Sequence, residues 1–152
     1  GFYDYDDNLY FSNEEVAHYT VENVTKSMAK GLSGGKETMT DSLDYVDLCR
    51  EFIDHIRFLD DQSGYFFIYD YNCINVAHGT QKNLQGQNLY NYQDSQGNYV
   101  IRGLVDIVKN HGNGVYTYYW NNPVTGDEEP KIAYVCSIPG IDYLIGSGIY
   151  LK

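Results

Sequence analysis

The sequence predicts an α+β fold, with a central antiparallel sheet of about five to six strands between two layers. Long N-terminal helices are expected on one face, and a layer of helix and loop on the other. Residues 14–59 carry apolar side chains at helical spacing. Residues 65–78 and 115–150 instead form runs rich in aromatic and β-branched residues, separated by short turns. Consecutive strands joined by short turns pair antiparallel, so helices must cover the sheet.

The length of 152 residues allows one domain with a real core. We expect an N-terminal segment with the first helix over residues 1–40 and a core over residues 41–152. The formal net charge of −11 excludes the basic face that nucleic acid binding requires, and it disfavours contact with an anionic membrane.

Two helices are expected before the first strand. Ser12 or Asn13 can cap the first, and the glycines at 31–35 are expected to end it. Asp41 or Ser42 can cap the second, which is expected to run to about Leu59 with an apolar stripe. Both helices are long enough to cover much of a sheet.

The strands are expected at residues 65–70, 74–78, 115–120, 131–137 and 143–150. Between the second and third strands lies a long polar connection, residues 79–97. Connections of this length commonly act as lids or binding walls. Asn98 can then cap a third helix at residues 99–110.

Side chains alternate across a strand, so Tyr116, Tyr118 and Trp120 share one face of their strand. A hairpin would bring Lys131 close to them. An ammonium beside phenol and indole donors is a plausible receptor for a small anion or carboxylate. The alternative is a sheet with an aromatic core and a surface lysine.

The last strands carry the stretch YYWNNPVTGDEEPKIAYVCSIPGIDYLIGSGIYL, and IRFLDDQSGYFFIYDYNCINVAH lies upstream. Both resemble motifs of the single Cache domains of bacterial and archaeal chemoreceptors and sensor histidine kinases, which have a PAS-like fold. The resemblance covers roughly residues 41–151. Two positions depart from the pattern: Ile141 stands where the family has Trp, and Gly79 follows His78 where the family often has Pro.

The resemblance implies an extracytoplasmic ligand-binding domain of a transmembrane receptor, in which homodimers are common when the receptor is intact. Such a domain binds a small molecule without transforming it and needs no cofactor. We expect a short monocarboxylate such as acetate, propionate, pyruvate or lactate, with Lys131 supplying the charge. Urea or an amide is the uncharged alternative. The expected ligand-binding residues are Lys131, Tyr118, Trp120, Tyr65, Phe67, His78, Tyr116 and Arg57.

Two other function classes stay open. A calcium-dependent interaction module would use an EF-hand-like spacing near the N-terminus, although Leu9 stands where that loop needs Gly. Its ligands would be Asp4, Asp6, Asn8, Tyr10, Ser12 and Glu15. A hydrolase or isomerase would depend on His78 as its base, and no GxSxG or HExxH motif supports one.

No apolar run reaches the length of a membrane span. Because the family's domain sits between two transmembrane helices, we expect an excised domain that stops near the second helix, with Gly1 as a cloning remnant. Cys49, Cys73 and Cys136 have no metal-site spacing and are expected to act as small hydrophobic residues.

Overall fold

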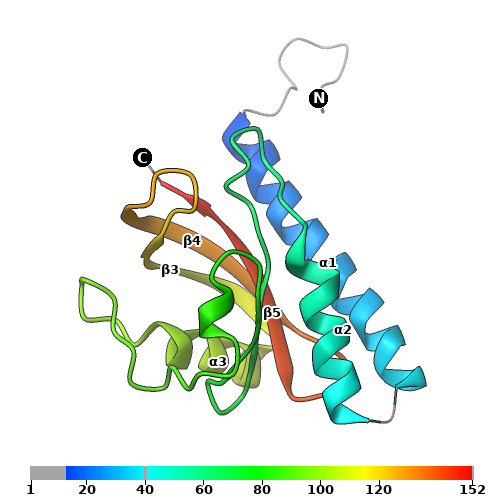
Figure 1. Cartoon of the computed structure of the whole chain (residues 1–152). Helices are drawn as coiled ribbons and strands as arrows, with labels where there is room; N and C mark the ends of the chain where they lie inside the picture. Colours follow the sequence, from blue (N-terminus) through cyan, green and yellow to red (C-terminus); the bar gives the residue numbers. More distant parts are fainter. Residues whose placement is uncertain (1–12, 40, 152) are drawn as a thin grey trace, which may run out of the picture.

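The computed structural model in Figure 1 describes residues 13–39 and 41–151. Five strands form one antiparallel sheet in the order β2-β1-β5-β4-β3. The elements in chain order are α1 (Asn13–Thr38), α2 (Ser42–Asp54), β1 (Phe67–Asp70), β2 (Asn75–His78), the 3-10 helix η1 (Lys82–Leu84), α3 (Val100–His111), β3 (Asn113–Asn121), β4 (Glu128–Ser137) and β5 (Tyr143–Tyr150).

The sheet separates two layers, as the sequence predicts (Figure 1). Helices α1 and α2 lie on one face, where α1 contacts β4 and β5 and α2 contacts β2. Helix α3 and the connection before it cover the other face. A separate apolar core fills the space on each side of the sheet. The predicted α+β, PAS-like architecture is therefore confirmed, with five strands.

Helix α1 does not end at the glycines of residues 31–35, as expected, but continues to Thr38. Tertiary packing outweighs the low helix propensity of glycine here. A Cβ on Gly35 would lie 2.8 Å from Leu48 Cδ2 of α2, so glycine allows a close approach of the two helices. Leu32 is fully buried, and the Tyr45 hydroxyl donates to its carbonyl at 2.7 Å.

Helix α2 begins where predicted and ends earlier. The Asp41 carboxylate accepts hydrogen bonds from the amides of Leu43 and Asp44, so it is the N-cap. The helix ends at Asp54 rather than near Leu59, and His55 is its C-cap. Leu59 itself has a left-handed backbone with φ of 69°, which a right-handed helix does not allow.

Helix α3 begins after Tyr99, and Asn98 is not its cap. Instead, Asn98 donates through its backbone and side-chain nitrogens to the carboxylate of Asp94. Asp94 also accepts from the amide of Tyr119 in β3 at 2.9 Å, which ties the long connection to the sheet. Burial opposes ionisation of Asp94, but these hydrogen bonds prevail and keep its pKa below the usual value.

The register of the central strands determines which side chains lie next to each other at the candidate site. Lys131 in β4 lies opposite Tyr118 in β3 on one side and opposite Tyr150 in β5 on the other. Residues directly opposite each other point to the same face. The single lysine is thus flanked by two phenols on the face that α3 covers.

Strand β5 also contacts the opposite layer. The Ser147 hydroxyl lies 2.8 Å from the Thr25 hydroxyl of α1, and both residues are fully buried. Thr25 also donates to the carbonyl of Val21 within its own helix. A buried polar contact therefore joins α1 to the middle of the sheet. Cys49, Cys73 and Cys136 are buried and free, as expected of small hydrophobic residues.

Candidate ligand-binding site

A small cavity lies between the sheet and α3. Its volume is about 10 Å³, which is room for about one water molecule. The walls come from β1, β2, β3, β4 and α3, and from Tyr65, two residues before β1. The lining residues are Tyr65, Phe67, Tyr69, His78, Ile101, Leu104, Tyr118, Trp120 and Lys131.

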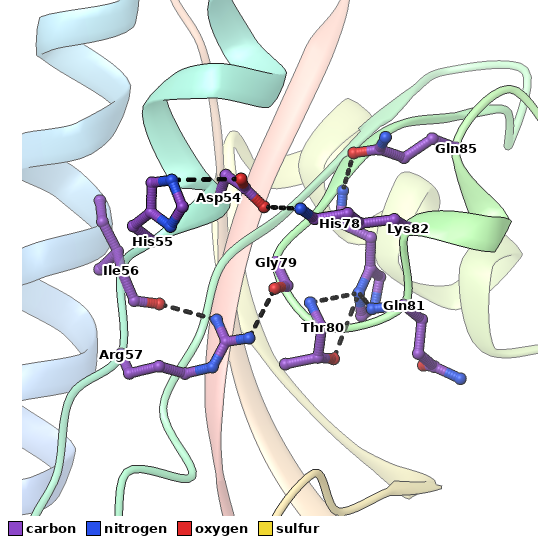
Figure 2. A network of polar contacts seen from close by, with 10 residues as sticks. All are labelled: Asp54, His55, Ile56, Arg57, His78, Gly79, Thr80, Gln81, Lys82 and Gln85. Atoms are coloured by element: carbon purple, nitrogen blue, oxygen red, sulfur yellow. Dashed lines mark hydrogen bonds and ion pairs between the residues drawn. The ribbon is translucent and has the colours of Figure 1, made fainter.

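Six of the eight predicted ligand-binding residues therefore lie together around one cavity: Lys131, Tyr118, Trp120, Tyr65, Phe67 and His78. The other two lie outside its lining. Tyr116 packs over Gly103 of α3, where a Cβ would meet its ring at 2.8 Å. Arg57 donates to the carbonyls of Ile56 and Gly79, at 3.0 and 2.7 Å (Figure 2).

Lys131 is the charged group of the cavity, and it is 1% exposed. Its Nζ donates to the Tyr65 hydroxyl at 2.9 Å and lies 4.3 to 5.9 Å from the centroids of four aromatic rings. None of the salt bridges among the described residues involves Lys131. Burial lowers the pKa of Lys131 to about 7, because an ammonium loses its hydration there.

Two glycines of the IGSG motif in β5 make room for this arrangement. A Cβ on Gly148 would lie 2.6 Å from Lys131 Cε and 2.6 Å from the carbonyl oxygen of Ile132. A Cβ on Gly146 would lie 2.4 Å from the ring of Phe67. The motif therefore has a steric cause: only glycine lets the lysine and the phenylalanine lie against β5.

Tyr65 and Tyr150 extend the polar end of the cavity beyond Lys131. Their hydroxyls lie 3.0 Å apart, and Tyr150 donates to the carbonyl of Asn121 at 2.6 Å. The ammonium, the two phenols and the carbonyl form one hydrogen-bonded chain. The chain fixes the position of Lys131 Nζ without giving it a negative partner.

His78 closes the cavity at the end of β2. Its Nδ1 accepts from the amides of Thr80 and Gln81, at 3.2 and 2.9 Å, so the proton of the neutral ring is on Nε2 (Figure 2). The ring lies 5.1 Å from that of Tyr65 and 6.2 Å from that of Trp120. Burial, with Lys131 and Arg57 nearby, lowers the pKa of His78 to about 3, so the ring is neutral at physiological pH.

Residues 79–97 lie next to the lining residues His78 and Trp120, and they are not without structure. They carry η1, and their backbone bonds to the edge of β2 through Gly86 and Asn75 at 2.8 Å. Gln81 accepts a hydrogen bond from the Trp120 indole at 2.8 Å. Outside the cavity, Lys82 pairs with Asp54 of α2 at 2.5 Å (Figure 2). The predicted lid is thus held at both the cavity and α2.

Tyr69, Tyr150 and Gln81 have site roles that the sequence did not single out. Tyr69 follows Tyr65 and Phe67 on the same strand face, so alternation alone could have included it. Tyr150 and Gln81 depend on cross-strand register and on the path of the lid, which no local pattern specifies.

The calcium candidates can be followed only in part. Asp4, Asp6, Asn8, Tyr10 and Ser12 lie outside the described residues, and Glu15 lies exposed in the first turn of α1. Within residues 13–39 and 41–151, no three His, Cys, Asp or Glu side chains gather where they could hold a metal ion. In the same part of the chain, no helix is long and apolar enough to cross a membrane.

Known proteins share part of this sequence and its overall fold. The sensor histidine kinase MctS of Rhizobium johnstonii is 36% identical over 90 residues, which make up 59% of this chain and 19% of the kinase. The chain therefore spans about a fifth of that relative. A methyl-accepting chemotaxis protein from Vibrio parahaemolyticus superposes with a TM-score of 0.77, at 27% identity over 91% of both chains.

A third similar protein is a Cache chemosensory domain whose structure concerns carboxylic acid recognition. It has a TM-score of 0.75 and 24% identity, covering 93% of this chain and 100% of that one, a likeness in fold. The family model of single Cache domain 2 matches residues 15–152. The chain belongs to the single Cache domain 2 family, the sensor domains found in chemoreceptors and sensor histidine kinases.

Proposed function

We propose that this chain is the extracytoplasmic ligand-binding domain of a transmembrane signalling receptor, and that it recognises a short monocarboxylate of the acetate, propionate, pyruvate or lactate class. It binds the acid without transforming it. The observation that carries the proposal is Lys131, an ammonium buried in a cavity wall that has no carboxylate partner among the described residues.

The charge balance favours an anionic ligand. A buried ammonium loses hydration, and a partner of opposite charge offsets that loss. At ~4 Å and an effective dielectric constant of ~20, one ammonium–carboxylate pair gains roughly 4 kcal/mol before desolvation. The Nε2 proton of His78 lies in the same wall and can donate to the second carboxylate oxygen, whereas the single proton of Tyr65 is already donated to Tyr150.

The size of the cavity requires a second conformation. Room for about one water is too little for a ligand of four or more heavy atoms. Binding must therefore widen the cavity, and a ligand shifts a two-state equilibrium only by binding one state better. With its narrow cavity, the described structure corresponds to the closed arrangement in this proposal.

The lid, residues 79–97, is the part proposed to move. On the cavity side, the Trp120–Gln81 and His78–Gln81 hydrogen bonds hold it closed. Gly79 follows His78 directly, and Arg57 fixes its carbonyl from the opposite layer. Residue 79 is therefore the natural hinge, and the motion would pass to α1 through the sheet.

A thermal-shift screen tests the ligand class. Acetate, propionate, pyruvate, lactate, urea and acetamide are added to the parent and to Lys131→Met. A ligand at a hundred times its dissociation constant stabilises by about 2.7 kcal/mol. We expect an acid to raise the Tm of the parent and not of the variant.

The matched control is Lys30→Met, which removes the same charge from an exposed position on α1 and should leave the response intact. If the acids stabilise Lys131→Met as well as the parent, the cavity is not their site. If only urea or acetamide stabilises the parent, the ligand is uncharged and Lys131 acts as a neutral donor.

A further inference from the structure

One buried hydroxyl in the cavity wall, that of Tyr69, has no hydrogen-bond partner among the described residues. Tyr69 is 1% exposed and lines the cavity. Among the described residues, three buried side-chain atoms lack a hydrogen-bond partner: Tyr69 Oη, Asn75 Oδ1 and Tyr134 Oη. Tyr134 belongs to the core on the other face of the sheet, and Asn75 does not line the cavity. Of the three, Tyr69 alone lies at the cavity.

A buried hydroxyl without a partner loses its hydration and regains nothing. Phenylalanine would fill the same volume at this position without that loss. Asn75 lies opposite Tyr69 in the strand register, and its amide partly opposes the rise in the Tyr69 pKa that burial causes. No Asn75 atom is in hydrogen-bond geometry with the phenol, however, so we regard the hydroxyl as unpaired.

The position of Tyr69 relative to the charged group suggests what would pair with it. Tyr65 and Tyr69 lie on the same face of the chain, on either side of Phe67. The Tyr65 hydroxyl is bonded to Lys131, so this end of the cavity carries the positive charge. Tyr69 offers a neutral donor and acceptor farther along the same wall, beyond the ring of Phe67.

We propose that the Tyr69 hydroxyl binds a second polar group of the ligand, so that the site selects short hydroxy- or oxo-monocarboxylates over unsubstituted acids of the same length. This inference rests on the proposed function. The carboxylate would lie at Lys131 and His78, and the hydroxyl or oxo oxygen at Tyr69. An unsubstituted acid would leave the Tyr69 hydroxyl unpaired in the complex, which is a strong basis for discrimination.

The test measures the dissociation constants of lactate, pyruvate and propionate by isothermal titration calorimetry. The proteins are the parent, Tyr69→Phe and Tyr134→Phe, a matched loss of a buried, unpaired phenol hydroxyl on the other face of the sheet. We expect Tyr69→Phe to weaken lactate and pyruvate about threefold to tenfold, the value of one hydrogen bond, and propionate less than twofold. Tyr134→Phe should change none of the three.

Stability of the free protein provides a second readout. Because Tyr69→Phe removes an unpaired hydroxyl, its Tm should equal or exceed that of the parent. A clear drop in Tm would mean that the hydroxyl has a structural partner, and the inference would be wrong. Equal weakening of all three acids, or of none, would also overturn it while leaving the proposed function in place.

The variant Lys131→Met distinguishes a failure of the proposed function from a failure of the Tyr69 assignment. Under the proposed function it abolishes binding of all three acids, whatever Tyr69 does. If it leaves their binding intact, or if the parent binds none of them, the proposed function fails and the assignment of Tyr69 fails with it.

Discussion

The pH dependence of ligand affinity follows from the burial of Lys131. Its pKa in the free protein is about 7, whereas a bound carboxylate favours the ammonium and raises that pKa in the complex. Raising the pH from 6 to 8 therefore removes the proton from the free site but not from the occupied one. The acid itself stays ionised throughout, because carboxyl groups titrate near pH 4.

The magnitude follows from the fraction of protonated sites. With a pKa of about 7, roughly 0.9 of the sites carry the ammonium at pH 6 and roughly 0.1 at pH 8, and apparent affinity scales with the competent fraction. The dissociation constant of pyruvate should therefore rise about tenfold over this range. His78, neutral well above its pKa of about 3, contributes nothing to the change.

Calorimetry at pH 6, 7 and 8, in two buffers of different ionisation enthalpy, measures both quantities. Binding at pH 8 should take up about 0.9 proton per site, and binding at pH 6 about 0.1, by linkage. An affinity that is constant from pH 6 to 8, with no proton uptake at pH 8, would refute the reasoning. Lys131 would then be protonated in the free protein, and its burial would not have the stated effect.

Four further outcomes are expected. The folded-state pKa of Lys131 lies below its unfolded value of 10.5, so stability should rise with pH between the two values. Urea titrations of the free protein should show an unfolding free energy about 2 kcal/mol larger at pH 9 than at pH 7, and Lys131→Met should not show this increase. The pKa of His78 is about 3 in the folded protein and 6.5 when unperturbed, so the free energy of unfolding should fall as the pH drops below 6.5 and the unfolded state binds the proton. His78→Asn keeps a hydrogen-bond acceptor without this titration, and should therefore unfold at a lower pH than the parent. Gly148→Ala should lower the unfolding free energy by about 1–3 kcal/mol, since its Cβ meets Lys131 and a backbone carbonyl; an unchanged urea midpoint would contradict this contact. Gln81→Leu should shift the fluorescence of Trp120, the one tryptophan of the sequence, and speed ligand dissociation in stopped-flow; unchanged rates would mean that the lid is held elsewhere.

Patterns within single elements could be predicted from the sequence, and long-range contacts could not. The last strand was predicted at the residues where β5 lies, because its alternation and flanking turns are local. The predicted end of α1 was wrong. Glycine at position 35 serves the close approach of Leu48 from another helix, and this contact cannot be read from the local sequence.

The candidate site shows the same division. The sequence placed Lys131 beside Tyr118 and Trp120, since a hairpin determines that neighbourhood. It could not place Arg57, whose partners are carbonyls supplied by the start of the lid and by Ile56. The sequence could not predict that the Tyr69 hydroxyl is unpaired, because this depends on whether any neighbour across the cavity has a hydrogen-bonding group within reach.

Side chains alternate along β5, so neighbouring residues of this strand contact the two opposite layers of the domain. Gly148 touches the lysine side chain on the ligand face, and its neighbour Ser147 holds the buried hydroxyl of Thr25 on the helix face. A ligand that displaces Lys131 by a fraction of an ångström would therefore act one peptide bond away from the anchor of α1. Under the proposed function, this strand would have the ligand on one side and α1 on the other, so the displacement would reach the helix without a relay of side chains across the domain.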